Sequence, residues 1–375
     1  MTAPPTIAAY DVRRENAAYE TLFASDLVAI LADGQLVLGN HVEAFEARFA
    51  AFCGTRHCVG VGNGLDALSL ALQALGIGPG DDVVVPAFTF IATWFSVSRL
   101  GARPVPVDVL DDGTMDPGRL RAAMTARTRA IIPVHLFGRL ADMAAISAIA
   151  GDVPVVEDAA QAHGATRNGR RAGAFGVMAA FSFYPTKNLG ALGDGGGVTC
   201  DDDRLARRVR ALANYGSERK YRHEMVGQNS RLDALQARFL STKLPELDRR
   251  NACRSRIAGQ YLAALGTLPG LACPPQGADD MVWHQFVLRT PCRDRLQAAL
   301  LDDGVGTAIH YPVTPFDQPC YAGLYDRELY PVAGRLAATV LSLPMAAYLS
   351  DAEVARVIAA VRAASTAPRS RSIPS

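Results

Sequence analysis

A lysine stands between an apolar run and a glycine-rich turn in FSFYPTKNLGALGDGG, Phe181–Gly196. Partial burial at a strand end lowers the pKa of a lysine, and it favours the uncharged amine that attacks a carbonyl carbon. Lys187 is therefore a candidate for covalent chemistry with an aldehyde. The alternative is a solvated lysine at a strand end, which is the commonest setting of this residue type.

Two carboxylates end another apolar run, in VPVVEDAAQAHGA, Val153–Ala165. Ligands of open α/β sheets bind beyond the carboxyl ends of the strands. A carboxylate held there, such as that of Asp158, could keep a pyridine nitrogen protonated, which makes pyridoxal phosphate (PLP) an electron sink. The alternatives are that Asp158 caps the following turn and that His163 is a hydrogen-bonded core residue.

Two further strand ends complete the pattern. In GVGNGLDALSLAL, Gly60–Leu72, a tight turn precedes a helix that starts near Leu65, and free amides at a helix start bind phosphate. This turn matches neither a Walker loop nor a dinucleotide fingerprint. PAFTFIATW, Pro86–Trp94, offers aromatic rings that could lie on a planar cofactor or pack in the core. Together the four features predict a PLP site.

Short apolar runs alternate with helix-like segments over the first two thirds of the chain, which predicts an α/β domain with a mainly parallel sheet between helices. The expected strands are His57–Val61, Val83–Pro86, Val105–Val107, Ala130–Val134, Val153–Glu157, Met178–Phe183 and Gly197–Cys200. The expected helices are Leu65–Leu75, Ile91–Leu100, Pro117–Ala126 and Ala141–Ala150.

The pattern changes after Ser230, where Arg231–Leu265 reads as one long helix broken at Pro245. A strand at Val282–Arg289, a helix near Asp294–Asp303 and the segment Val332–Thr339 predict a smaller C-terminal α+β unit. We therefore divide the chain into a large domain, 1–245, a small domain, 246–366, and a polar tail, 367–375, that we expect to be disordered.

The composition excludes several classes of protein. The 375 residues carry a net charge of +1, which gives no general attraction for nucleic acid or membrane. We find no secretory signal, no apolar stretch long enough to span a membrane and no CxxC pair, so we expect a cytoplasmic protein without a metal site. The seven scattered cysteines fit reduced thiols.

The chain resembles the nucleotide-sugar aminotransferases, the DegT-like branch of the fold-type I PLP enzymes, from roughly Gly34 to Ser350. The resemblance is specific because many motifs recur in one order. They are LVLGNHVEAFEARFA (Leu36–Ala50), GVGNGLDAL, VVVPAFTFIATW, AIIPVHLFG, VVEDAAQAHGA, SFYPTKNLGALGDGG, GQNSRLDALQA (Gly227–Ala237), GVGTAIHYP (Gly304–Pro312) and SLPM (Ser342–Met345).

The resemblance implies roles around the cofactor ring. Lys187 looks like the Schiff-base lysine, and like the base that moves a proton between the substrate carbon and C4′ of the cofactor. Asp158 looks like the partner of the pyridine nitrogen, and Gln161 like a contact of the ring hydroxyl. Phe90 matches the aromatic residue that stacks on the ring.

The same resemblance implies a phosphate site and a homodimer. The backbone amides of Gly64 and Leu65 and the side chain of Ser182 match phosphate ligands. Asn229 matches a residue that reaches the phosphate from the neighbouring subunit, so two subunits would share their sites. Further candidates for contact with substrate are His163, Tyr184, His310 and Tyr311.

Two positions depart from the family pattern. Many relatives carry Thr at the position of Leu65, so a hydroxyl contact to phosphate is lost here. Relatives often have a His where this chain has Phe316, which puts inherited sugar contacts nearby in doubt. Relatives with His in place of the lysine are dehydratases, so Lys187 favours transamination.

The resemblance implies transfer of an amino group from L-glutamate to a keto sugar carried by a nucleotide, in a ping-pong scheme. NGLDAL, SRLDALQA and GTAIHYP look more like the 3-keto-6-deoxyhexose enzymes than the 4-keto enzymes. We therefore expect amination at C3 of a dTDP-linked sugar, with C4 of a dTDP- or GDP-4-keto-6-deoxyhexose as the alternative. Alternatives of other classes are a non-catalytic regulator with the same fold, sugar dehydration and cysteine desulfuration.

Overall fold

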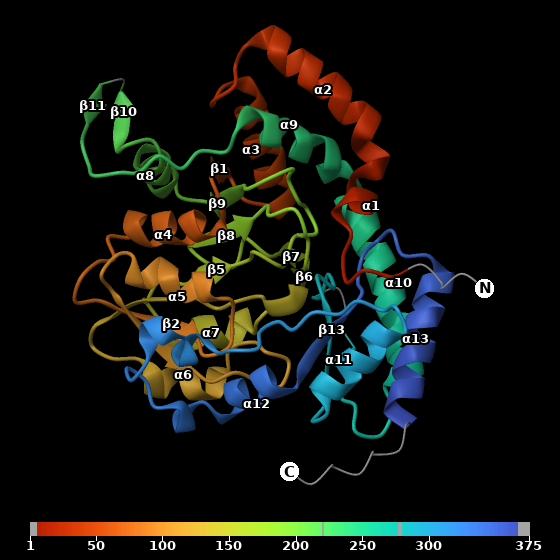
Figure 1. The fold of residues 1–375 in the computed structure, drawn as a ribbon. Helices are drawn as coiled ribbons and strands as arrows, with labels where there is room; N and C mark the ends of the chain where they lie inside the picture. Colours follow the sequence, from red (N-terminus) through yellow and green to blue (C-terminus); the bar gives the residue numbers. More distant parts are fainter. Residues whose placement is uncertain (1–5, 220, 277–279, 367–375) are drawn as a thin grey trace.

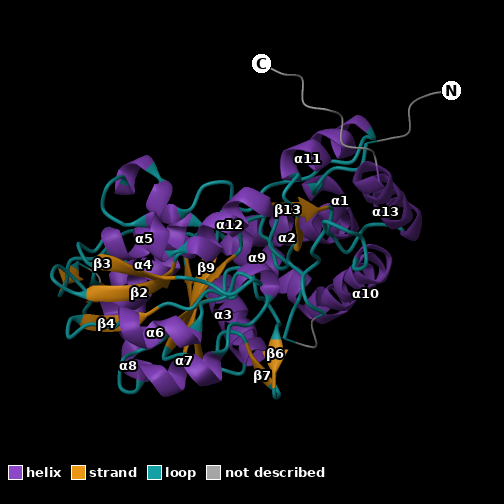
Figure 2. Cartoon of the chain, turned by 90° about the horizontal axis from the view of Figure 1, so that it is seen from below, coloured by secondary structure: helices purple, strands orange, loops and turns teal. Residues whose placement is uncertain are grey.

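The computed structural model describes residues 6–219, 221–276 and 280–366. The expected disordered tail, 367–375, lies outside the described residues. Two groups of strands form the main sheet, in the orders β3-β2-β4 and β5-β8-β9-β1 (Figures 1 and 2). Their bounds are β1 His57–Val61, β2 Asp82–Pro86, β3 Arg103–Val107, β4 Thr128–Ile131, β5 Val156–Asp158, β8 Met178–Ser182 and β9 Gly196–Cys200.

Parallel bridges between Ile131 and Val155 and between Val134 and Asp158 join the two groups into one surface. β9 runs antiparallel to both of its neighbours, while β2, β3 and β4 pair in parallel, as do β5 and β8. The mainly parallel sheet predicted from the sequence is therefore confirmed. Its parallel strands bring the carboxyl ends of β2, β4, β5 and β8 to one edge, where the candidate residues lie.

Helices cover both faces of this sheet because its strands are apolar on both sides (Figure 2). Val83 and Val85 pack on one face with α4 (Gly64–Ala74), α5 (Ile91–Ser98) and α8 (Asp203–Ala213). Val84 points to the other face, toward α6 (Pro117–Ala123) and α7 (Met143–Ala150). Under β8 and β9, that second face is covered by α3 (Asn40–Cys53) and α9 (Ala234–Lys243).

The helix predicted over Arg231–Leu265 begins at Ala234, and it is interrupted at Pro245 as expected. α9 ends at Lys243, a 3-10 turn spans Leu244–Glu246, and α10 (Leu247–Leu265) follows. Proline has no amide hydrogen for the helical ladder, which accounts for the break. α10 packs with α11 (Arg293–Asp302) and α13 (Asp351–Thr366) against an antiparallel pair of strands, β12 (Phe286–Arg289) and β13 (Val340–Leu343).

The prediction of a strand over Val282–Arg289 is wrong for the first half of this range. Only Phe286–Arg289 pairs with β13. The amides of Val282 and Gln285 bond instead to the carbonyl groups of Gly138 and Phe137, at 3.0 and 3.3 Å. Residues 282–285 therefore form a loop against residues 137–138, in which Val282 and Trp283 are buried.

The segment Val332–Thr339, assigned from the sequence to the C-terminal unit, forms the helix α12 (Pro331–Thr339), but it packs away from the α10–α13 cluster. Ala333, Leu336 and Ala337 belong to the core of the large sheet, and Figure 1 shows α12 beside α6. Asp108, just after β3, caps this helix by accepting the amide hydrogen of Val332 at 3.0 Å. An element late in the sequence therefore completes the large core.

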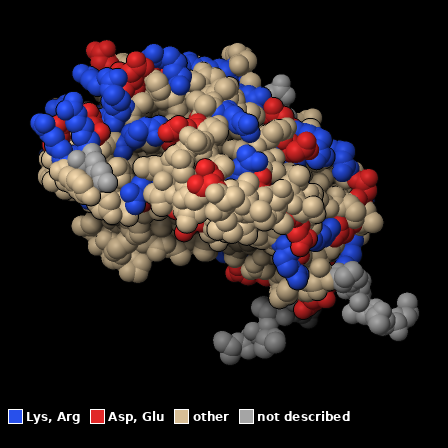
Figure 3. Space-filling view, turned by 90° about the horizontal axis from the view of Figure 1, so that it is seen from above, with Lys and Arg blue, Asp and Glu red and all other residues tan. Residues whose placement is uncertain are grey.

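The remaining elements lie around this framework. They are α1 (Val12–Asn16), α2 (Glu20–Asp33), β6 (Thr166–Arg167), β7 (Arg170–Arg171), β10 (Ser217–Arg219), β11 (Arg222–His223) and 3-10 turns at Ala17–Tyr19, Leu136–Gly138, Pro315–Asp317, Pro319–Tyr321 and Arg327–Leu329. Acidic and basic side chains are interspersed on the face in Figure 3. Within the described residues, no helix is both long and apolar enough to cross a membrane.

Candidate active site

Lys187 lies in a tight turn after β8, and its amide donates to the carbonyl group of Tyr184 at 2.9 Å. The side chain is partly buried. Burial lowers the pKa of Lys187 to about 8, and the negative charge of Asp158 opposes that shift. The turn therefore presents an amine that carries an appreciable uncharged fraction near neutral pH.

Distant polar side chains hold the lysine turn in place. The side-chain amide of Asn188 donates to Oδ1 of Asn251 at 2.8 Å and to the backbone carbonyl of Val282 at 2.9 Å. The buried Nζ of Lys243 donates to the Gly190 carbonyl at 2.8 Å. The sequence reasoning did not identify these partners, because they lie more than fifty positions away along the chain.

Asp158 ends β5 with a side chain that is 6% exposed. Its Oδ2 accepts from Thr93 Oγ1 at 2.8 Å, and its Oδ1 accepts from the Ala160 amide at 3.2 Å. Burial nevertheless raises the pKa of Asp158 above its ordinary value. A carboxylate in this setting is stabilised by a cation placed against it, and a protonated pyridine nitrogen is such a cation.

Gln161 and Tyr311 meet beside Asp158. Gln161 Oε1 accepts from the Phe137 amide at 2.6 Å, and its Nε2 donates to the Tyr311 hydroxyl at 3.0 Å. The Tyr311 ring lies 5.5 Å from that of Phe90, centroid to centroid. Phe90 is 53% exposed at the start of α5, so much of its ring stays open to a planar ligand.

The start of α4 lies against the end of β8 with almost no intervening space. A Cβ added to Gly64 would lie 2.7 Å from Cβ of Ser182. The Asn63 side chain caps the helix by accepting the Asp66 amide hydrogen at 2.8 Å. The amides of Gly64 and Leu65 precede the first bond of the helical ladder and sit at its positive end, which is an arrangement that binds phosphate.

Replacing Gly64 by alanine is expected to weaken PLP binding by at least tenfold, because the new methyl group forces the helix start away from Ser182. PLP titration of the apoprotein measures the effect. Gly259→Ala is the matched control, since an added Cβ there meets nothing within 4 Å. That control lies inside α10, and it should raise stability slightly without changing PLP affinity. Equal affinity in both variants would contradict the phosphate assignment.

Three histidines lie close enough to Lys187 for its charge to lower their pKa values, and all three are uncharged near neutral pH. Burial, reinforced by the charge of Lys187, lowers the pKa of His163 to about 3 and that of His310 to about 4. The same causes hold the pKa of His284 well below its usual range. His284 was missed by the sequence reasoning, and it contacts Asn188 Oδ1 through Nδ1 at 3.2 Å.

The other candidates from the sequence differ in their burial and in their contacts. His163 is fully buried, with its ring centroid 5.3 Å from that of Phe181. His310 Nδ1 lies 2.8 Å from Ser342 Oγ. The Tyr184 side chain is 52% exposed, and Asn229 is exposed next to Ser230. Within one chain, Ser230 rather than Asn229 meets the glycine turn, through a 3.0 Å bond from the Gly62 amide.

The rate at which the apoprotein reacts with PLP is expected to rise about tenfold per pH unit below pH 8 and to level off above it. The sign follows because the uncharged amine reacts, and its fraction grows until the pH passes the pKa of Lys187. Absorbance measures the rate, and borohydride trapping with peptide mapping identifies the modified lysine. A rate that kept rising to pH 10, as for an ordinary solvated lysine, would refute the lowered pKa.

The residues present fit PLP at each of its functional parts. A glycine-lined helix start lies against Ser182 and would suit the phosphate, and a buried carboxylate, that of Asp158, would suit a protonated ring nitrogen. An open aromatic face, that of Phe90, and an amine of lowered pKa, that of Lys187, complete the set. This combination of donors and burial suits a planar, phosphorylated aldehyde.

The chain is similar to known proteins over almost its whole length. Residues 19–362 match the model of the DegT/DnrJ/EryC1/StrS aminotransferase family. The dTDP-3-amino-3,4,6-trideoxy-alpha-D-glucose transaminase of Streptomyces venezuelae is 51% identical over 354 residues, which cover 92% of this chain and 93% of the relative. The erythromycin biosynthesis sensory transduction protein EryC1 of Saccharopolyspora erythraea is 51% identical over 341 residues, covering 89% and 93%.

A solved structure extends the comparison to the fold. The crystal structure of Streptomyces venezuelae DesV in complex with a ketimine intermediate superposes with a TM-score of 0.95 at 47% identity, over 97% of this chain and all of that one. The sequence motifs, the arrangement of the site and these matches lead to one conclusion. The chain belongs to the DegT/DnrJ/EryC1/StrS aminotransferase family.

Proposed function

We propose that the protein transfers an amino group to C3 of a dTDP-linked 3-keto-6-deoxyhexose, with PLP as cofactor and L-glutamate as amino donor. One observation carries the proposal most directly. An amine whose pKa burial lowers to about 8, that of Lys187, lies within electrostatic reach of the buried carboxylate of Asp158 at a strand-end edge. The name of the Streptomyces venezuelae transaminase, 51% identical, supports C3 as the carbon that receives nitrogen.

When bound, PLP supplies a carbonyl carbon that accepts and hands on an amino group, and a ring that withdraws electrons from the carbon losing a proton. The protein supplies the rest. Lys187 holds the cofactor and then, as a free amine, carries the proton between the substrate carbon and the cofactor carbon. Asp158 stabilises the positive charge of the ring nitrogen, while Phe90 and Gln161 orient the ring.

The substrate specificity can be tested with purified protein. We expect it to convert a dTDP-3-amino-6-deoxyhexose and 2-oxoglutarate into a 3-keto sugar and L-glutamate, which is the reverse and more easily assayed direction. A 4-deoxy version of that sugar should be included, since the relative's product lacks the C4 hydroxyl. The matching 4-amino sugar is the control. If the protein converts only the 4-amino sugar, the amino group is transferred at C4 and not at C3.

A regulatory function is the second candidate, because one relative at 51% identity is named as a sensory transduction protein. The same assay separates the two functions. A protein that binds PLP but turns over neither amino sugar nor L-glutamate would favour regulation.

We also propose a homodimer with shared sites. Apolar side chains are exposed along α2, including Leu22 at 56%, Val28 at 68% and Leu31 at 64%, and such a stripe is typical of a covered surface.

Light scattering measures the mass of the protein in solution and so tests the homodimer. Mixing Lys187→Ala subunits with Asn229→Ala subunits tests the sharing, since one site of each mixed dimer is then intact. Recovery toward about a quarter of wild-type activity is expected, and no recovery would place Asn229 in its own subunit's site.

A further inference from the structure

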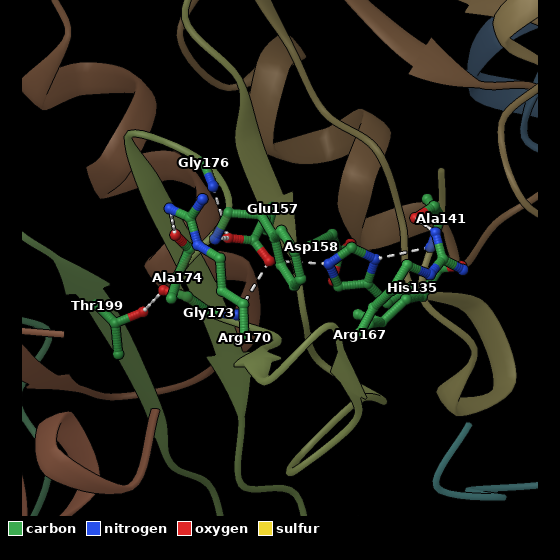
Figure 4. A network of polar contacts seen from close by, with 12 residues as sticks. His135, Ala141, Glu157, Asp158, Arg167, Arg170, Gly173, Ala174, Gly176 and Thr199 are labelled. Carbon is green, nitrogen blue, oxygen red and sulfur yellow. Dashed lines mark hydrogen bonds and ion pairs between the residues drawn. The ribbon is translucent and has the colours of Figure 1, made fainter. Parts of the chain in front are cut away.

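Two consecutive carboxylates end β5, and they serve opposite faces of the sheet because neighbouring residues of a strand alternate. Asp158 faces Lys187, while Glu157 is fully buried behind it. Glu157 accepts hydrogen bonds from the backbone amides of Gly173, Phe175 and Gly176, at 2.9, 2.6 and 2.7 Å (Figure 4). The loop that leads into β8 is therefore anchored on this one carboxylate.

A histidine supplies the fourth hydrogen bond of Glu157. Nε2 of His135 lies 2.9 Å from Oε2 of Glu157, and Nδ1 accepts the Ala141 amide hydrogen at 3.1 Å (Figure 4). Because Nδ1 is an acceptor, the ring hydrogen resides on Nε2 and the imidazole is neutral. Four donors occupy the lone pairs of an ionised carboxylate, and the His135 ring is fixed from both sides.

The main chain around His135 holds the two side chains that face the cofactor ring. The Pro133 carbonyl accepts the Asp158 amide hydrogen at 2.9 Å, and the His135 amide donates to the Asp158 carbonyl at 3.0 Å. Two residues later, the Phe137 amide donates to Oε1 of Gln161 at 2.6 Å. The segment 133–137 thus positions Asp158 by bonding to the Asp158 backbone, and it positions Gln161 by bonding to the Gln161 side chain.

We propose that His135 and Glu157 are positioning residues for the ring end of the cofactor site. They lock the segment 133–137 against β5, and through it they fix how Asp158 and Gln161 meet the ring. This inference rests on the proposed use of PLP. It adds a function for two side chains that touch neither cofactor nor substrate, on the face of the sheet away from the chemistry.

The test uses the full-length protein reconstituted with PLP labelled with ¹⁵N in the ring. For His135→Ala we expect a PLP dissociation constant raised about tenfold or more, as for other residues that orient ligands indirectly. We also expect the ring-nitrogen signal to move toward that of neutral pyridine, because Asp158 is no longer held against it. His135→Gln should retain most of both properties, since its amide can still donate to Glu157.

Asp82→Asn is the matched control for a purely structural effect. Asp82 is also buried in the sheet, but it lies at the opposite end of β2, where it accepts from Arg103 and Thr125 at 2.8 and 2.7 Å. Its replacement should lower the melting temperature and leave the ring-nitrogen signal unchanged. If His135→Ala behaves in the same way, with normal PLP affinity, the positioning function is refuted.

Two other outcomes are also decisive. If His135→Ala is insoluble, His135→Asn replaces it, because Asn keeps the acceptor for Ala141 but loses the donor to Glu157. Weaker PLP binding by His135→Asn than by His135→Gln supports the proposal, and equal binding refutes it. If the wild-type protein binds no PLP, the proposed function fails and this inference fails with it.

Discussion

Replacing Lys187 by alanine is expected to lower transamination by at least about 10⁴-fold, the upper end of what a positioned acid–base group contributes. Under the proposed function, the change removes both the covalent attachment of the cofactor and the base that moves the proton. The visible absorbance of PLP held by the lysine should be lost as well, although we expect the proposed phosphate site at Gly64 and Ser182 to retain the cofactor. Steady-state kinetics and an absorbance spectrum before and after addition of L-glutamate measure the two effects.

Lys187→Arg is the sharper comparison, because arginine keeps the positive charge near Asp158 but does not lose its proton at accessible pH. We expect it to be as inactive as the alanine variant. Substantial activity in the arginine variant would mean that Lys187 acts through its charge alone, and the chemistry would then need another base.

Replacing Asp158 by asparagine is expected to change activity and stability in opposite directions. Activity should fall about 10²–10³-fold, as when one preorganised electrostatic partner is removed. The apoprotein should melt at a higher temperature at pH 7, because asparagine removes a charge that burial disfavours even with the charge of Lys187 nearby. The Thr93 hydroxyl can turn to accept from the new amide, so the hydrogen bond is retained.

The pH dependence of this effect follows from the raised pKa of Asp158. A carboxyl group whose pKa is raised by folding stabilises the folded state below its unfolded pKa, and this contribution is lost as the pH rises through the folded pKa. The stability advantage of Asp158→Asn should therefore be absent in acid and should grow as the pH rises through the folded pKa of Asp158. Calorimetry of both apoproteins between pH 4 and 8 tests it, and PLP-bound protein should show the reverse order.

Sequence reasoning identified residues whose neighbours along the chain reveal their setting. Lys187, Asp158 and Gly64 each follow an apolar run or a tight turn, so strand ends could be recognised locally. The sheet was predictable for the same reason, because uninterrupted apolar runs such as β2 indicate strands covered on both faces. The interruption of the helix at Pro245 was a local property too.

Residues that act through distant partners could not be found in this way. Thr93 in α5 donates to Asp158 at the end of β5, and Asn251 reaches the lysine turn from α10. The sequence predicts a strand at Val282, where the structure has a buried loop, because apolar composition indicates burial and not hydrogen bonding. In each case the decisive partner is set by the tertiary fold, and one sequence does not record such pairings.

The two ends of the described chain are joined, and this has a consequence for folding during synthesis. Ile7 pairs with Val305, and it exchanges hydrogen bonds with Gly304 and Gly306 at 2.9 and 2.7 Å. It packs in the same cluster as α13, the last described helix. The segment around Ile7 therefore acquires its partners only after Gly304, Gly306 and α13 have been synthesised, so this cluster closes late in folding.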